Sequence, residues 1–139
     1  MSSIGEIENE IVEDFELFDD WEGKYEYLIG LGKDLPLIDE KYKTDEYLVR
    51  GCQSRVWLHA SHEGDKVFYT ADSDAIITKG LVGLMIKVLS GQKASDIANA
   101  DLSFIDRVGL KEHLSPTRSN GLTSMIKQMK LYALALNKS

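Results

Sequence analysis

Apolar side chains recur at helical spacing through the first third of the chain. Positions three or four residues apart carry isoleucine or phenylalanine, with acidic residues between them, at Ile4, Ile7, Ile11, Phe15 and Phe18. This spacing predicts an amphipathic helix whose apolar stripe faces the core. Asp19 and Asp20 can cap a second helix. We expect the glycines and the proline within residues 30–36 to end that helix.

Short runs of strand-forming residues occupy the middle of the chain. Residues 46–50 and 53–60 are rich in valine, leucine, tyrosine and tryptophan, which favour extended backbone. A polar turn at residues 62–65 leads into another such run at residues 66–70. The sequence therefore predicts a small antiparallel sheet that contains a hairpin.

The remaining chain returns to helical spacing. Residues 77–89 carry an apolar face that ends at a Ser-Gly pair. Ser95 and Ser103 can each cap a short helix, and Ser115 followed by proline predicts the start of a long last helix. Two helices, then a small antiparallel sheet, then a run of helices along the chain make an α+β fold, and we expect one domain over residues 1–139.

Composition and charge favour a globular protein and exclude several classes of function. Of the 139 residues, 43% are hydrophobic, and the first fifty carry 15 acidic side chains against 5 basic ones within a formal net charge of −7. This balance argues against a phosphate-binding surface for nucleic acid. The longest uncharged apolar stretch, residues 80–86, is too short to span a membrane. The acidic start does not resemble a signal peptide, so we expect a cytoplasmic protein.

Few residues of this chain are suited to hold a metal ion or a cluster. Cys52 is the only cysteine, so it cannot form an internal disulfide. An iron–sulfur cluster usually needs four protein ligands, mostly thiolates. The histidines lack the paired spacing of zinc ligands, and they stand at His59, His62 and His113. We therefore expect no metal site and no resident cofactor.

The segment around the cysteine is the most unusual part of the chain. Gly51 permits a tight turn between two strand-forming runs, so we expect the thiol at the tip of a loop. Arg50 and Arg55 flank the thiol, and positive charge favours the reactive thiolate. Spacing alone does not decide which arginine reaches the sulfur. A cysteine that serves only to pack the interior is the alternative at this point.

Three short segments carry a recognisable pattern around Cys52. A Gly-Cys-Gln-Ser-Arg run opens residues 51–58, an Asp-Ser-Asp run opens residues 72–81, and a Ser-Pro-Thr-Arg-Ser-Asn run lies within residues 114–122. In this order and around a single cysteine, they resemble the SufE family of sulfur-acceptor proteins. The Gln-Ser pair after the cysteine favours the SufE branch over the related CsdE branch.

The resemblance implies a fold similar to that of the IscU scaffold proteins and a role in persulfide relay. Proteins of this family take sulfur from a pyridoxal-phosphate-dependent cysteine desulfurase of the SufS type, stimulate that enzyme, and deliver the sulfur for iron–sulfur cluster assembly. Cys52 would carry the persulfide, and the pyridoxal phosphate would belong to the partner. The resemblance implies supporting roles for motif residues Gly51, Gln53, Arg55, Asp74 and Arg118.

Two other functions stay open on the residues alone. A stand-alone cysteine hydrolase or transferase would pair Cys52 with a histidine base and would turn over without a partner. A pure interaction module would use Cys52 only for packing. We expect a sulfur-transfer partner and desulfurase activator rather than a stand-alone enzyme, because a carrier needs one thiol and this chain has one.

Overall fold

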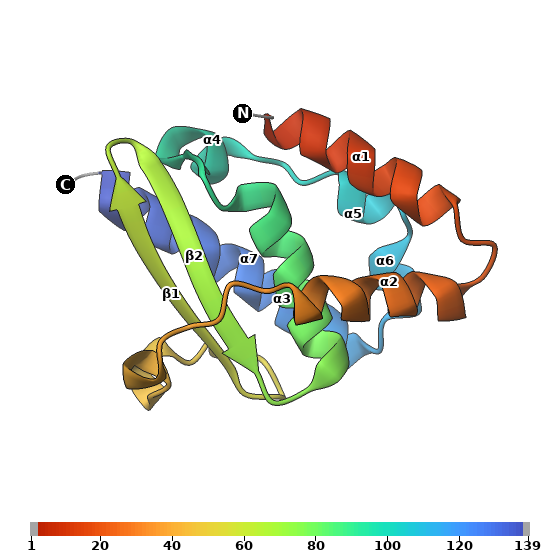
Figure 1. The fold of residues 1–139 in the computed structure, drawn as a ribbon, viewed down its shortest axis with the longest axis horizontal. Helices are drawn as coiled ribbons and strands as arrows, with labels where there is room; N and C mark the ends of the chain where they lie inside the picture. Colours follow the sequence, from red (N-terminus) through yellow and green to blue (C-terminus); the bar gives the residue numbers. More distant parts are fainter. Residues whose placement is uncertain (1–2, 138–139) are drawn as a thin grey trace.

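Two antiparallel strands and one buried helix form the centre of the fold (Figure 1). The computed structural model describes residues 3–137. Strands β1 (Val56–Glu63) and β2 (Lys66–Ser73) pair along their full lengths, which confirms the predicted hairpin, and the short β3 (Gln92–Lys93) adds to β2. Helix α3 (Ile76–Leu89) follows β2, and ten of its fourteen residues are buried. The other helices pack around it.

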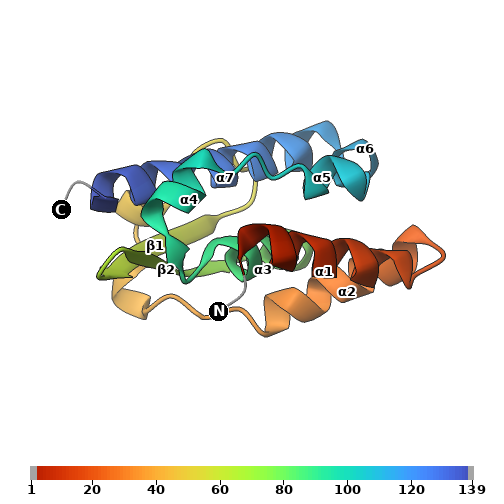
Figure 2. The ribbon, with the colours of Figure 1, turned by 90° about the horizontal axis from the view of Figure 1, so that it is seen from above.

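Helices cover this centre on two sides (Figure 2). Helix α7 lies across one face of the sheet with α4, α5 and α6 on the same side, whereas α1 and α2 lie on the other side. Their bounds are α1 Ile4–Glu16, α2 Trp21–Lys33, α4 Ala94–Asn99, α5 Phe104–Arg107, α6 Leu110–His113 and α7 Pro116–Asn137. This is the α+β architecture that the sequence predicted. Within residues 3–137, no helix has both the length and the apolar character needed to cross a membrane.

Helices α2 and α3 cross at very short range because glycines face each other there. A Cβ atom at Gly80 would lie 2.5 Å from the backbone oxygen of Leu28, and one at Gly83 would lie 2.7 Å from that of Leu31. Both distances are shorter than real Cβ atoms tolerate, so the two backbones touch only because these positions lack side chains. The expectation that glycines end α2 is wrong, because Gly32 lies inside the helix at this crossing.

Two tyrosines fix α7 against the sheet. The buried Tyr69 hydroxyl of β2 donates a hydrogen bond to the backbone oxygen of Met129 at 2.7 Å, and the Tyr132 hydroxyl donates to that of Leu58 in β1 at 3.2 Å. Buried hydroxyl and carbonyl groups are costly without such partners. These bonds therefore set the position of α7 and, with it, of the residues nearer its N-terminus.

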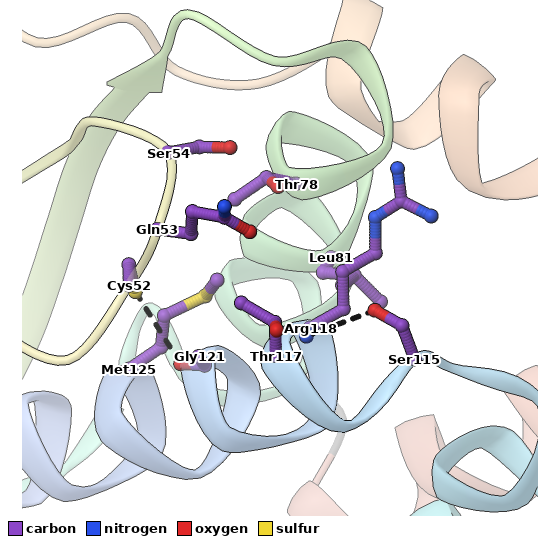
Figure 3. Close-up of a pocket in the computed structure, with 10 residues that line it drawn as sticks. All are labelled: Cys52, Gln53, Ser54, Thr78, Leu81, Ser115, Thr117, Arg118, Gly121 and Met125. Carbon is purple, nitrogen blue, oxygen red and sulfur yellow. Dashed lines mark hydrogen bonds between the residues drawn. The ribbon is translucent and has the colours of Figure 1, made fainter.

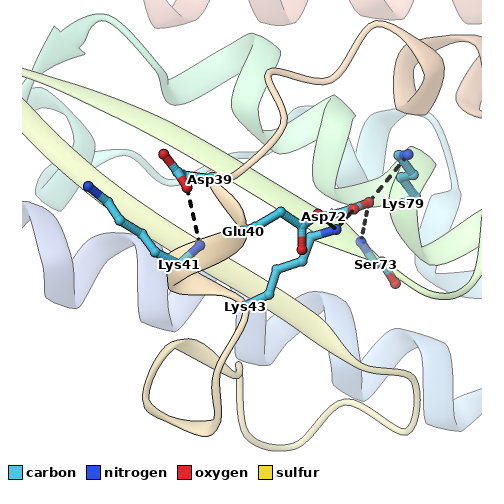
Figure 4. Close-up of polar contacts among 7 residues, drawn as sticks. All are labelled: Asp39, Glu40, Lys41, Lys43, Asp72, Ser73 and Lys79. Carbon is cyan, nitrogen blue, oxygen red and sulfur yellow. Dashed lines mark hydrogen bonds and ion pairs between the residues drawn. The ribbon is translucent and has the colours of Figure 1, made fainter.

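Residues 36–48 form a strap between α2 and the Cys52 loop. Ala71 of β2 donates its backbone N–H to the oxygen of Pro36 at 3.1 Å. Further along the strap, Lys43 pairs with Asp72 at 2.7 Å, and Lys79 of α3 pairs with the same carboxylate at 3.3 Å (Figure 4). Burial opposes ionisation of Asp72, but hydrogen bonds from Lys43, a backbone N–H and Lys79 together lower its pKa. The strap is thus tied to β2 at two points before it reaches the loop.

The predicted strand over residues 46–50 is wrong. The strap instead contains two single 3-10 turns, η1 (Glu40–Tyr42) and η2 (Asp45–Tyr47), and then only one bridge, between Leu48 and Trp57. The segment meets β1 only at this bridge and at the hydrogen bond from the Val49 N–H to the Val56 oxygen, so no ladder forms.

Helix starts were predicted with mixed success. Asp20 caps α2 by accepting the backbone N–H of Gly23 at 2.9 Å, and the Ser115 hydroxyl caps α7 by accepting that of Arg118 at 3.2 Å. Ser95 does not cap α4, because that helix begins one residue earlier.

Candidate functional site

The loop of residues 50–55 is closed at its base by the core. The backbone N–H of Val49 donates to the oxygen of Val56 at 2.8 Å, and both side chains are buried. Gly51 then turns the chain with φ +93°, a conformation that other residues adopt only under strain. A Cβ atom there would also lie 2.4 Å from the Ser124 hydroxyl. The predicted tight turn at this glycine is confirmed.

Asp74 holds the downstream end of the loop. Its carboxylate accepts the backbone N–H of Arg55 at 3.0 Å, and its own N–H donates to the backbone oxygen of Arg55 at 3.3 Å. These two bonds fix the backbone of one residue from both sides. Asp74 therefore belongs to the support of the loop rather than to the surroundings of the sulfur.

Replacing Asp74 by alanine should free the downstream end of the loop. We expect Cys52 to react with iodoacetamide about two to ten times faster, at a cost of about 1 kcal/mol in unfolding free energy, because one hydrogen bond to a charged acceptor is lost. Glu13→Ala, which removes an exposed carboxylate from α1, is the control for charge. Equal alkylation rates in wild type and the Asp74 variant would show that this bond does not restrain the loop.

The Cys52 thiol points inward against helix α7. Its Sγ donates a weak hydrogen bond to the backbone oxygen of Gly121 at 3.5 Å, and the side chain is half-buried. Gly121 lies directly beside the sulfur, and a Cβ atom there would sit 3.5 Å from Sγ, an ordinary packing distance. Burial raises the pKa of the Cys52 thiol. In this resting state the thiol is therefore protonated and a poor nucleophile.

A pocket of about 250 Å³ opens beside the thiol (Figure 3). It lies between the loop, the first turns of α3 and the first turns of α7. Hydroxyl groups, apolar side chains and one guanidinium group share its wall, which comprises Cys52, Gln53, Ser54, Thr78, Leu81, Ser115, Thr117, Arg118, Gly121 and Met125. The wall offers both apolar contact and hydrogen-bond donors to a group carried on the sulfur.

The flanking arginines are not the ones that share this pocket. Arg50 and Arg55 are exposed and line a second pocket, which Cys52 also lines, but not the pocket that Arg118 lines. Arg118, more than sixty residues later, lines the pocket, and Figure 3 shows its guanidinium directed away from Cys52. The structure thus brings Gln53 and Arg118 to the pocket with Cys52.

All three histidines lie in other surroundings. His59 stacks on Tyr42 with 3.9 Å between ring centroids, and His113 stacks on Trp21 at the same separation. His62 contacts the backbone at the exposed end of the hairpin. Burial and the charge of a nearby lysine lower the pKa of His59. None of the three lines the Cys52 pocket, so no histidine is in position to serve as its base.

Sequence reasoning named Cys52, Gln53 and Arg118 and missed the other seven residues of the pocket wall. Six of these lie within the three motifs, and that membership was the available signal: Ser54, Thr78, Leu81, Ser115, Thr117 and Gly121. Met125 lies on the apolar stripe of α7 and is 2% exposed, so its spacing indicated only a core residue. In the sequence, a side chain that belongs to both the core and the pocket wall has the same pattern as an ordinary core residue.

Comparison of the sequence with known proteins gives consistent matches over most of the chain. The sequence model of the family described as "SufE: Fe-S metabolism associated domain" matches residues 9–133. An "Uncharacterized SufE-like protein" of Rhizobium meliloti (strain 1021) is 43% identical over 127 residues, which cover 88% of this chain and 91% of that protein. "SufE-like protein 1, chloroplastic/mitochondrial" of Arabidopsis thaliana is 42% identical over 128 residues, which cover 91% of this chain and 34% of that longer protein.

A solved structure shares the fold. The solution structure of a hypothetical protein from Thermus thermophilus superposes with a TM-score of 0.80, covering 96% of this chain and 97% of that one. The two sequences are 21% identical. At that identity the likeness describes the arrangement of strands and helices alone.

Proposed function

This chain belongs to the SufE family, whose domain is associated with iron–sulfur metabolism, and we propose that it accepts sulfur on Cys52 from a cysteine desulfurase of the SufS type. It then delivers that sulfur to an iron–sulfur scaffold. The observation that carries the proposal is the placement of the only cysteine, on a loop tied at both ends, with its thiol beside a pocket. The cytoplasm is the proposed compartment, because the relay needs a reduced thiol.

The transfer step exchanges one sulfur–sulfur bond for another. The Cys52 thiolate attacks the outer sulfur of the desulfurase's persulfide, and the bond between that sulfur and the desulfurase cysteine breaks. The desulfurase cysteine leaves as a thiolate, and Cys52 holds the added sulfur as a persulfide. No oxidant is consumed. The pyridoxal phosphate that supplies the persulfide belongs to the desulfurase.

Burial of the resting thiol requires the loop to move before this step. The raised pKa keeps Cys52 protonated against α7, whereas attack needs the thiolate. A docked partner therefore has to draw residues 50–54 outward, and the turn at Gly51 is the position with the greatest backbone freedom. The desulfurase would thereby select the state in which the thiol ionises.

After transfer the same pocket can shelter the product. A water molecule takes up about 30 Å³ of liquid, so a pocket of about 250 Å³ has room for one more sulfur atom. Leu81 and Met125 would exclude small thiols and oxidants by apolar contact, while the hydroxyls of the wall supply donors to an anionic persulfide. The Arg118 guanidinium would add a further donor after turning toward the sulfur (Figure 3).

The partner would dock around the loop and the start of α3. Ile76, the first residue of α3, is 69% exposed although it is a large apolar side chain. Gln53 and Arg118 are exposed beside the pocket. An apolar contact rimmed by polar groups is typical of transient protein interfaces.

Mass spectrometry after incubation with desulfurase and cysteine tests the function directly. We expect the mass of the wild-type chain to rise by one sulfur atom on the Cys52 peptide, and thiol reduction to reverse the gain. Omitting the desulfurase is the matched control. Hydrolase or transferase turnover by the chain alone, without any sulfur gain, would favour the stand-alone cysteine enzyme instead.

Replacing Arg118 by alanine should slow sulfur transfer about three- to tenfold. The unfolding free energy should change by less than about 0.5 kcal/mol, because the side chain is exposed. Transfer kinetics at varied carrier concentration would separate docking from chemistry, and Lys111→Ala, an exposed cation on α6, controls for net charge. Wild-type kinetics in the Arg118 variant would remove this residue from the site.

A further inference from the structure

The partner of the resting thiol is a group that can only accept hydrogen bonds. Cys52 Sγ lies 3.5 Å from the backbone oxygen of Gly121, and a carbonyl oxygen has lone pairs but no proton to give. It therefore attracts a protonated thiol and repels a thiolate. A sulfur that already carries a second sulfur atom has no proton on Sγ either. This contact is thus specific for the empty, protonated carrier.

The missing side chain at position 121 controls the strength of the same contact. Gly121 lies inside α7, where glycine weakens a helix relative to alanine. A Cβ atom at this position would meet Cys52 at ordinary packing distances, 3.5 Å from Sγ, 3.8 Å from Cα and 3.9 Å from Cβ. The resting loop would tolerate alanine and pack better against it. Glycine instead leaves less contact between α7 and Cys52 than alanine would give.

We propose that the Cys52–Gly121 contact is a latch that holds the loop inward while the carrier is empty, and that Gly121 is a positioning residue that keeps this latch weak enough to open. The inference rests on the proposed function, since loading means addition of sulfur to Cys52. Loading removes the Sγ proton and with it the hydrogen bond. The loaded loop therefore leaves the pocket more readily when the acceptor docks.

Anchoring of the loop ends confines this release to a few residues. The Val49–Val56 hydrogen bond and the two bonds between Asp74 and Arg55 lie outside the latch and do not involve the sulfur. They persist when the thiol contact is lost. Only residues 50–54 gain freedom on loading, and the core and the remaining pocket wall are unchanged.

A pair of Cys52 variants tests the latch without any desulfurase. Cys52→Ser keeps a donor for the Gly121 oxygen, whereas Cys52→Ala removes it. Backbone ¹⁵N relaxation of residues 51–54 should give order parameters of about 0.85 in the serine variant. In the alanine variant we expect order parameters below about 0.6, or microsecond exchange that the serine variant does not show. Equal mobility in the two variants, whether both are rigid or both mobile, would overturn the latch.

A pair of glycine variants tests the role of position 121. Gly121→Ala and Gly30→Ala both remove a glycine from a long helix, but a Cβ atom at Gly30 would meet nothing within 4 Å. We expect iodoacetamide to react with Cys52 about three- to tenfold more slowly in Gly121→Ala and within about twofold of wild type in Gly30→Ala. An unchanged or faster rate in Gly121→Ala would contradict the positioning role.

Failure of the latch and failure of the proposed function give different results. Relaxation and alkylation are read on the isolated chain, so they report the latch even if no sulfur is ever transferred. If wild-type carrier gains sulfur by mass while the Cys52 pair shows equal mobility, the function stands and the latch is rejected. If Gly121→Ala accepted sulfur more slowly, in proportion to its slower alkylation, the latch would be connected to sulfur acceptance.

Discussion

We expect that replacing Cys52 by serine abolishes sulfur acceptance and leaves the fold nearly intact. The hydroxyl of serine hardly ionises near neutral pH and attacks a persulfide far more weakly than a thiolate does. The half-buried thiol makes one weak hydrogen bond at the pocket wall, so the unfolding free energy should change by less than about 1 kcal/mol. Desulfurase assays with mass detection and urea unfolding of the same preparation measure both effects.

The outcome separates a relay thiol from a structural one. Ser61→Ala, which removes an exposed hydroxyl from β1 outside the pocket wall, is the matched control and should still accept sulfur. If the Cys52→Ser chain lost cooperative unfolding, the cysteine would be a core residue, and the interaction-module interpretation would gain support. Sulfur gain elsewhere on the Cys52→Ser chain would remove Cys52 from the reaction altogether.

Replacing Gly80 by alanine is expected to cause the largest loss of stability. The new Cβ would lie 2.5 Å from the oxygen and 2.8 Å from the carbonyl carbon of Leu28, and backbone atoms cannot move aside as a flexible side chain does. Helices α2 and α3 would have to separate, at a cost of about 3 kcal/mol. Urea unfolding measures the loss.

Gly30→Ala gives the matching control for Gly80→Ala. The new methyl group has open space in α2, so stability should stay constant or rise by up to about 1 kcal/mol through helix propensity. Separation of the helices should also disturb the pocket, because Thr78 and Leu81 line it from the same stretch of α3. A Gly80 variant as stable as wild type would mean that the crossing is not tightly packed.

Elements with a repeating pattern could be predicted from the sequence. The apolar stripe of residues 4–18 became α1, the alternating runs on both sides of a polar turn became the hairpin, and Ser115 before a proline marked the start of α7. Each signal is local, since the residues that carry it lie within one element. The prediction of a strand at residues 46–50 was wrong because strand formation is not local. A strand needs a partner strand, and this segment makes only one bridged pair with β1.

The residues of the site were harder to predict from the sequence than the helices and the hairpin, because tertiary structure brings them together. Proximity along the chain made Arg50 and Arg55 the natural neighbours of the thiol, and they do share a second pocket with Cys52. The arginine that lines the pocket between α3 and α7 is Arg118, which reaches it through the placement of α7. Positive charge was expected to favour the thiolate, whereas burial raises the pKa of Cys52. Gly80 lies in the second motif, but it faces Leu28 where α2 and α3 cross. Residues of a family motif can therefore serve packing as well as chemistry.

Closure of the loop base has a consequence for protein engineering. The hydrogen bond between Val49 and Val56 joins the two ends inside the core, and Asp74 bonds only the backbone of Arg55. The attachment points of the intervening segment therefore do not depend on the side chains that it carries. The entropy of bringing such ends together grows only slowly with the length between them, by about 0.6 kcal/mol for each doubling. Loops of other lengths or sequences can thus be grafted between these two valines, so that one scaffold presents different reactive groups to the same pocket.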